Sequence, residues 1–115
     1  MTVDEVLSAA GLTLPDTATG VRAAGDPADG MVFVQFQVPD LEAAANFAKT
    51  TGCEASPIER LLDDPFRRSR PGAPEWWQSG PHEGALSCRT EGAARSIRLD
   101  PLDNGTVRVQ VAAVR

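Results

Sequence analysis

Several residue types are scarce or missing in this sequence, and each shortage excludes a class of site. The 115 residues include no tyrosine, one lysine, one histidine (His82) and two cysteines (Cys53 and Cys88). One histidine and two cysteines cannot fill a closed zinc site, and the short ligand spacings typical of such sites are absent. We therefore expect no metal, and nothing in the sequence indicates another cofactor.

Long apolar runs and a positive net charge are missing as well. No segment approaches the roughly 18–20 consecutive apolar residues of a membrane-spanning helix. The formal net charge of −5 argues against nonspecific binding to nucleic acid or to an anionic membrane. The first residues lack a basic leader followed by an apolar stretch, so we expect no signal peptide.

The remaining composition is that of one globular domain. Hydrophobic residues make up 42% of the chain, which is enough for a packed core. We therefore expect a single domain over residues 1–115. Arginine almost entirely replaces lysine, and alanine is abundant. This bias is typical of GC-rich codons, so we interpret it as a feature of the coding genome and not as a device for binding phosphate.

Two segments have the pattern of a capped amphipathic helix. Residues 2–5 read as a capping box, and Gly11 suits a left-handed stop, which together predict a helix over residues 3–10. A second helix is expected to begin after Asp40 as its N-cap and to end at Gly52. Its small alanine side chains would let it pack closely against a sheet.

Five segments have the alternation expected of strands. Residues 17–24 and 31–38 are predicted to form a hairpin, and 85–90, 95–100 and 106–114 a three-stranded meander. We expect the outer face of the meander to be exposed to water. That face carries Ser96, Arg98, Asp100, Arg108 and Gln110.

The order of these elements is helix, two strands, helix, long loop, three strands. Strands grouped in runs, with helices outside the runs, are typical of α+β proteins. The sequence therefore predicts a mostly antiparallel five-stranded sheet with two helices on one face.

The two cysteines allow two interpretations. A disulfide between Cys53 and Cys88 would close a long loop and could stabilise the fold by about 3–4 kcal/mol. Such a bond would imply an oxidising compartment. Two buried free thiols are the alternative, and the sequence does not decide between them.

Catalytic motifs give no positive signal. Carboxylates occur in pairs at Asp4/Glu5, Asp63/Asp64 and Asp100/Asp103, and paired acids can act in hydrolysis. Helix capping accounts for the first pair and a turn for the last. No GxSxG nucleophile motif and no glycine-rich phosphate loop is present. We expect no catalytic residue, although the enzyme question stays open.

The segment DPFRRSRPGAPEWWQSGPHEG, residues 64–84, concentrates unusual residues. Its prolines remove N–H donors, so no helix or central strand can run through it and we expect an irregular loop. Adjacent tryptophans cannot readily share one face of an extended chain, so one should anchor the loop and the other should be exposed. The candidate binding residues are Arg67, Arg68, Arg70, Trp76 and Trp77.

The chain also resembles a group of small uncharacterised actinobacterial proteins, many of them lipoproteins. The resemblance lies in the segments LSAAGLTLPDTATGVRAA, VQFQVPDLEAAANFAKTTGC and SIRLDPLDNGTVRVQVAAV. In this group a strand ending near Phe36 and Pro39 leads into a helix beginning at Asp40-Leu41. A variable loop with tryptophan and a meander rich in Arg and Val follow. The resemblance implies an α+β domain and slightly favours an extracytoplasmic location, whereas the chain as written carries no leader and would be cytoplasmic.

Three functional hypotheses follow from these observations. The first is a non-enzymatic binding or interaction domain that uses residues 64–84 as its recognition surface, with a protein or a small acidic ligand as partner and no specific nucleic acid. The second is an immunity or inhibitor protein that docks on a basic partner. The third is a small hydrolase whose carboxylates converge only in space. The oligomeric state is not indicated.

Overall fold

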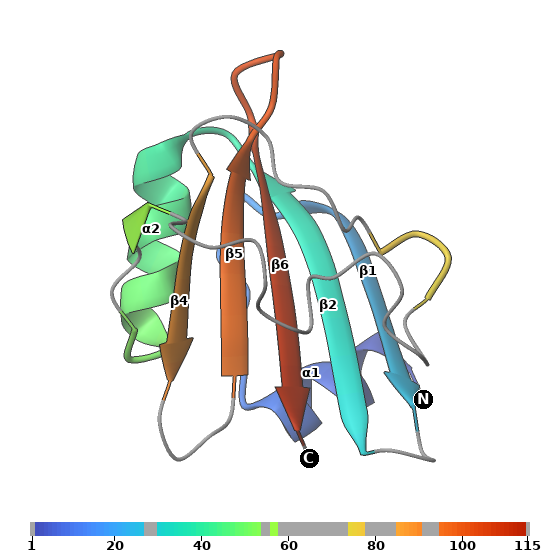
Figure 1. Ribbon diagram of the computed structural model, residues 1–115. Helices are drawn as coiled ribbons and strands as arrows, with labels where there is room; N and C mark the ends of the chain where they lie inside the picture. The colour runs from blue at the N-terminus through green and yellow to red at the C-terminus, as the bar shows by residue number, and fades with distance from the viewer. Residues whose placement is uncertain are drawn as a thin grey trace.

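A single antiparallel sheet organises the chain. The computed structural model describes residues 2–26, 30–53, 56–57, 74–77, 85–90 and 95–114. The elements are α1 (Val3–Ala10), β1 (Thr19–Asp26), β2 (Met31–Val38), α2 (Leu41–Thr50), β3 (Ser56–Pro57), β4 (Leu86–Thr90), β5 (Arg95–Pro101) and β6 (Val107–Val114). The six strands lie in the order β1-β2-β6-β5-β4-β3, as Figure 1 shows for the longer ones.

The α+β fold class predicted from the sequence is confirmed, and so is the order of its elements. The five predicted strands correspond to β1, β2, β4, β5 and β6, and all of them pair antiparallel. The two-residue strand β3 is an addition at the sheet edge, where it pairs with β4. Pro57 in β3 has no N–H to donate, and an edge strand is where a sheet tolerates that loss.

Local sequence signals explain where α1 begins and ends. The Thr2 hydroxyl accepts from the Glu5 backbone N–H, and the Glu5 carboxylate accepts from the Thr2 N–H, both at 3.2 Å. At the other end Gly11 has a φ of 68°, a left-handed conformation that glycine adopts without strain. The predicted capping box and glycine stop are both present.

Helix α2 follows β2 directly and crosses back over the sheet. Asp40 caps its first turn by accepting from the Ala43 N–H at 2.8 Å. The helix ends at Thr50, and Gly52 follows with a φ of 88°. The cap and the glycine therefore lie where the sequence predicts them.

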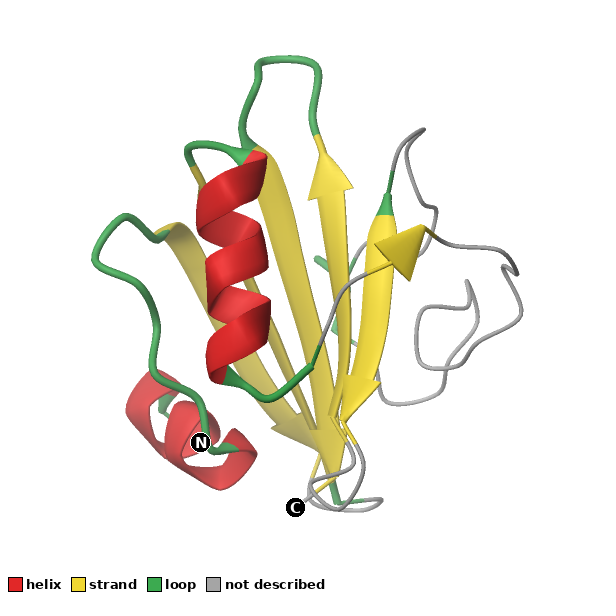
Figure 2. Cartoon of the chain, turned by 90° about the vertical axis from the view of Figure 1, so that its left-hand side faces the viewer, coloured by secondary structure: helices red, strands yellow, loops and turns green. Residues whose placement is uncertain are grey.

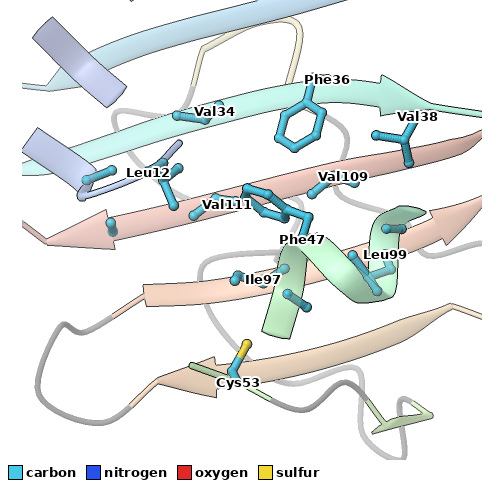
Figure 3. Close-up of a cluster of buried hydrophobic side chains, with 14 of the residues drawn as sticks. Leu12, Val34, Phe36, Val38, Phe47, Cys53, Ile97, Leu99, Val109 and Val111 are labelled. Carbon is cyan, nitrogen blue, oxygen red and sulfur yellow. The ribbon is translucent and has the colours of Figure 1, made fainter. Parts of the chain in front are cut away.

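Both helices cover the same face of the sheet (Figure 2). Phe47 of α2 packs edge-on against Phe36 of β2, with ring centroids 5.0 Å apart (Figure 3). Val6 of α1 is fully buried in the same cluster. The apolar face of the central strands supplies the rest of this core: Val32, Val34, Phe36, Val38, Ile97, Leu99, Val107, Val109, Val111 and Ala113.

Arg95, the first residue of β5, links the C-terminal ends of the two helices. Its guanidinium donates to the backbone oxygen of Gly11 at 3.0 Å and to that of Ala10 at 3.4 Å, just after α1. The same group donates to the Thr51 oxygen at 3.3 Å, just after α2. A cation at this position satisfies carbonyls that the helices leave without partners and complements both helix dipoles.

No helix among the described residues is long and apolar enough to cross a membrane.

Candidate binding site

Only part of the predicted recognition segment can be placed. Arg67, Arg68 and Arg70 lie outside the described residues, as do Asp63/Asp64 and His82. Pro74–Trp77 is described and forms a turn, in which the Trp77 N–H donates to the Pro74 oxygen at 3.0 Å. The site is therefore built from this turn and from the sheet face beneath it.

Trp77 is anchored on the face of the sheet that the helices leave open. Its side chain is 8% exposed and packs with Met31, Phe33 and Ala112 in a second, smaller apolar cluster. The Phe33 and Trp77 rings meet edge-on, with centroids 5.1 Å apart. Edge-to-face aromatic pairs of this kind contribute about 0.5–1.5 kcal/mol beyond their area burial.

Trp76 contacts Trp77 and packs against the same apolar cluster. Its ring centroid is 6.2 Å from that of Trp77, with an interplanar angle of 65°. The side chain is half-buried, and the preceding Glu75 is exposed. Trp76 packs against the same apolar cluster as Trp77, so the two tryptophans differ in degree of burial, and Trp76 is half-buried where the sequence predicts one exposed tryptophan.

The polar side chains of the same sheet face are aligned in rows across the strands. Gln35, Gln110 and Arg98 occupy matching positions on β2, β6 and β5. The Gln110 amide donates to the Gln35 side-chain oxygen at 3.0 Å, and Arg98 donates to the Gln110 side-chain oxygen. In the next row Arg108 and Asp100 form an ion pair between β6 and β5.

The expectation of a water-exposed outer face on the meander is wrong. Arg98 is 1% exposed and Asp100 is fully buried. Arg108, Gln110 and Ser96 are buried as well. Alternation does indicate which side chains share a face, but it does not show whether a second layer covers that face. Polar side chains tolerate burial here because cross-strand partners hydrogen-bond them.

Burial changes the electrostatics of this network. Loss of solvation lowers the pKa of Arg98 to about 10, the nearby Asp100 charge opposes that shift, and the Arg108 charge adds to it. Arg98 therefore remains charged at neutral pH. The carboxylate of Asp100 is occupied by Arg108 and has no access to solvent, which suits a structural ion pair better than proton transfer to a substrate.

The structure joins Cys53 and Cys88 in a disulfide, one of the two alternatives that the sequence left open. Their Cα atoms are 5.9 Å apart, within the usual range for the bond. Cys53 follows α2 and is buried, while Cys88 lies on β4. The bond therefore ties the end of α2 to the sheet and connects both ends of the segment that contains the two tryptophans.

The members of the two described carboxylate pairs have different surroundings. Glu5 of the Asp4/Glu5 pair serves the α1 cap, and Asp100 is buried while Asp103 is exposed in the β5–β6 turn. Within the described residues, no group of three or more His, Cys, Asp or Glu side chains could hold a metal ion.

Sequence reasoning missed the buried polar rows, although a signal for one of them exists. Asn104 lies in the middle of the β5–β6 turn, and Asp100 and Arg108 are the same number of residues before and after it in the chain. A hairpin centred there places opposite charges directly across from one another. The Gln35–Gln110 contact has no such local signal, because it joins residues far apart in the chain.

Comparison of the chain with protein-family models, with curated proteins and with solved structures found no match.

Proposed function

We propose that the protein is a non-catalytic binding domain that contacts its partner through residues 64–84. In this proposal Trp77 anchors the segment to the sheet and Trp76 is the contact residue. The observation that carries the proposal is the half-buried Trp76 ring beside the buried Trp77 ring. An indole left partly in water forgoes about 1–2 kcal/mol of burial, which contact with a partner would recover.

The arrangement also supplies rigidity. Trp77 is fixed by Phe33 on β2, a strand paired on both sides, and the Cys53–Cys88 disulfide joins two residues that flank the segment. A contact residue held by such supports loses less conformational entropy on binding than one in a free loop. Loops positioned by a rigid sheet are a common place for binding residues.

A pull-down from the native host with Trp76→Ala tests the proposal. The matched control is Leu41→Ala, which removes an exposed apolar side chain at the start of α2. We expect partners recovered by the unmodified protein and by Leu41→Ala to be lost with Trp76→Ala. Equal recovery by all three proteins would contradict the proposal.

A second candidate function, an immunity or inhibitor protein for a basic partner, is supported by the exposed charges. Among the described residues the exposed carboxylates are Asp4, Glu5, Asp16, Asp40, Glu42, Glu75 and Asp103, and the exposed cations are Arg22, Lys49 and Arg89. An acidic surface speeds association with a basic protein and makes it sensitive to salt. If this second proposal holds, the captured partner has a basic surface and salt weakens its binding steeply.

The resemblance to actinobacterial lipoprotein-like domains remains a prediction. The disulfide agrees with the oxidising compartment that an extracytoplasmic location would provide. Thiol titration of protein freshly isolated from the native host, before and after unfolding, would test that location through the redox state of Cys53 and Cys88.

A further inference from the structure

An aromatic series of Phe33, Trp77 and Trp76 begins at the sheet, and a glutamate precedes Trp76 in the chain. Phe33, Trp77 and Trp76 meet edge to face in turn, at interplanar angles of 68° and 65°. Burial decreases along the series, from the fully buried Phe33 to the half-buried Trp76. The residue next to Trp76 in the chain is the exposed Glu75. The outer end of the series is therefore a half-buried indole, and the residue before it in the chain carries an exposed carboxylate.

This combination suits a cation. The face of an aromatic ring carries negative electrostatic potential, and tryptophan binds cations best among the aromatic side chains. The exposed carboxylate of the preceding Glu75 adds a Coulombic attraction for a cation that approaches this turn. Glu75 is exposed, so a partner can reach its carboxylate.

We infer that Trp76 and Glu75 together bind a cationic side chain, arginine or lysine, presented by a protein partner. The inference rests on the proposed function and adds the chemistry of the contact. The excess of exposed carboxylates over exposed cations among the described residues supports it, because it favours the approach of a basic surface. The competing possibility is an acidic partner held by Arg67, Arg68 and Arg70.

The direct test uses two synthetic peptides of equal length, one of alternating Arg and Gly and one of alternating Glu and Gly. Binding to the oxidised full chain is measured by calorimetry at low salt and by tryptophan fluorescence. We expect the basic peptide to bind and the acidic peptide not to bind. Trp76→Ala should weaken binding about fivefold, and Trp76→Phe should weaken it less, because phenylalanine keeps a weaker aromatic face.

Glu75→Gln and Glu42→Gln form the decisive pair. Both remove one exposed carboxylate and so lower the net negative charge equally, but Glu42 lies on α2 over the other face of the sheet. We expect Glu75→Gln to weaken binding of the basic peptide about threefold and Glu42→Gln to leave it unchanged. Far-UV circular dichroism of each variant verifies that it is folded.

Three results with the peptides would overturn the inference: binding of the acidic peptide in preference to the basic one, absence of binding by the basic peptide, or equal weakening by Glu75→Gln and Glu42→Gln. The last result would mean that net charge alone attracts the peptide. Failure of the proposed function gives a different result, namely partner capture that does not depend on Trp76. A captured partner that depends on Trp76 but not on Glu75 would contradict only the cation site.

Discussion

At the scale of single residues, the two tryptophans have different surroundings although they are neighbours in the chain. Trp77 is 8% exposed and packs against Phe33, whereas Trp76 is half-buried at the outer end of the aromatic series. Removing a buried ring leaves a cavity in addition to the lost transfer free energy. A partly exposed ring has less to lose, because water can fill the space.

Substitutions of Trp77 and Trp76 should therefore differ in their effect on the free energy of unfolding. We expect Trp77→Ala to lower the free energy of unfolding by about 3–5 kcal/mol and Trp76→Ala to lower it by about 1 kcal/mol. Equilibrium unfolding in urea, followed by far-UV circular dichroism, measures both values. Equal losses would show that the segment only covers the sheet and that neither ring is set apart as a contact group.

Glu5 gives a second prediction at this scale, concerning pH. Two hydrogen bonds with Thr2 lower the pKa of Glu5 below its ordinary value of 4.5. The one from the Thr2 backbone N–H has the larger effect, and the one involving the Thr2 hydroxyl has the smaller effect. The pKa of Glu5 is lower in the folded protein than in the unfolded chain. The stability that its ionised carboxylate contributes is therefore fully present at pH values above the ordinary pKa and is lost as the pH falls through the folded-state pKa.

The pKa of Glu5 can be followed by NMR titration of its side-chain carboxyl carbon. We expect a value below 4.5 in the unmodified protein and a rise toward 4.5 in Thr2→Ala, which loses the hydroxyl. An unchanged Glu5 titration in Thr2→Ala would contradict the role of the cap hydroxyl.

At the scale of elements, both helices depend on contacts made where they end. Arg95 donates to backbone oxygens after α1 and after α2, so one side chain of β5 holds two helices over the sheet. The disulfide adds a covalent connection between the end of α2 and β4. These contacts join segments that are distant in the chain, and neither helix could make them alone.

Arg95→Met should lower the free energy of unfolding by about 1–3 kcal/mol, the usual cost of losing hydrogen bonds to a charged group. The control is Arg89→Met, at an exposed arginine on β4, for which we expect a change within about 0.5 kcal/mol. Arg95→Lys should recover only part of the loss, because an ammonium group lacks the planar fork of the guanidinium. Denaturant unfolding measures all three variants. Equal effects of Arg95→Met and Arg89→Met would contradict the role of Arg95 in holding the two helix ends.

Replacing both cysteines by alanine should destabilise the protein by about 3–4 kcal/mol, as expected for a bond that spans 35 residues. A reducing agent should destabilise the unmodified protein by a similar amount and leave the Cys53→Ala/Cys88→Ala variant unchanged. Urea unfolding with and without reductant makes the comparison. A reductant effect of the same size in the variant would mean that the bond is not its cause.

At the scale of the whole molecule, β2 and β6 carry side chains for both faces of the sheet. Phe36 and Val109 enter the core under the helices, while Phe33 and Ala112 support Trp77 on the other face. The β2–β6 pairing also joins the N-terminal hairpin to the C-terminal meander. Loss of these central strands therefore disrupts both faces together.

Unfolding should accordingly be a single cooperative transition. Tryptophan fluorescence reports the face that carries Trp77, and far-UV circular dichroism reports the helices and the sheet. We expect the two signals to give the same midpoint in urea, as they do for small two-state domains. A fluorescence transition at clearly lower urea would show that the tryptophan face unfolds separately.

Most of the element order could be predicted from the sequence because its signals are local. The Thr2 cap, the Asp40 cap and the Gly11 stop each act within about one helical turn of the residue concerned. The alternation in β2 likewise assigns Phe36 and Gln35 to opposite faces whatever lies beside the strand.

The candidate site was predicted less completely. Sequence reasoning distinguished the two tryptophans in principle, but it could not say that Trp77 is the anchored one, because that depends on where Phe33 lies in the sheet. Sequence reasoning also predicted that Arg98 is exposed, whereas the structure buries it. The pattern of charges along a strand shows which face a side chain occupies and not what covers that face.

The sequence alone thus determined the helices, most of the strands and the inward or outward direction of their side chains, because capping and alternation depend only on near neighbours. Only the tertiary structure decided that β6 lies between β2 and β5, which brings Gln110 to both Gln35 and Arg98 and buries the hydrogen bond between Arg98 and Gln110. Pairing between distant strands is set by the combined burial of both sheet faces and not by the residues of any one strand.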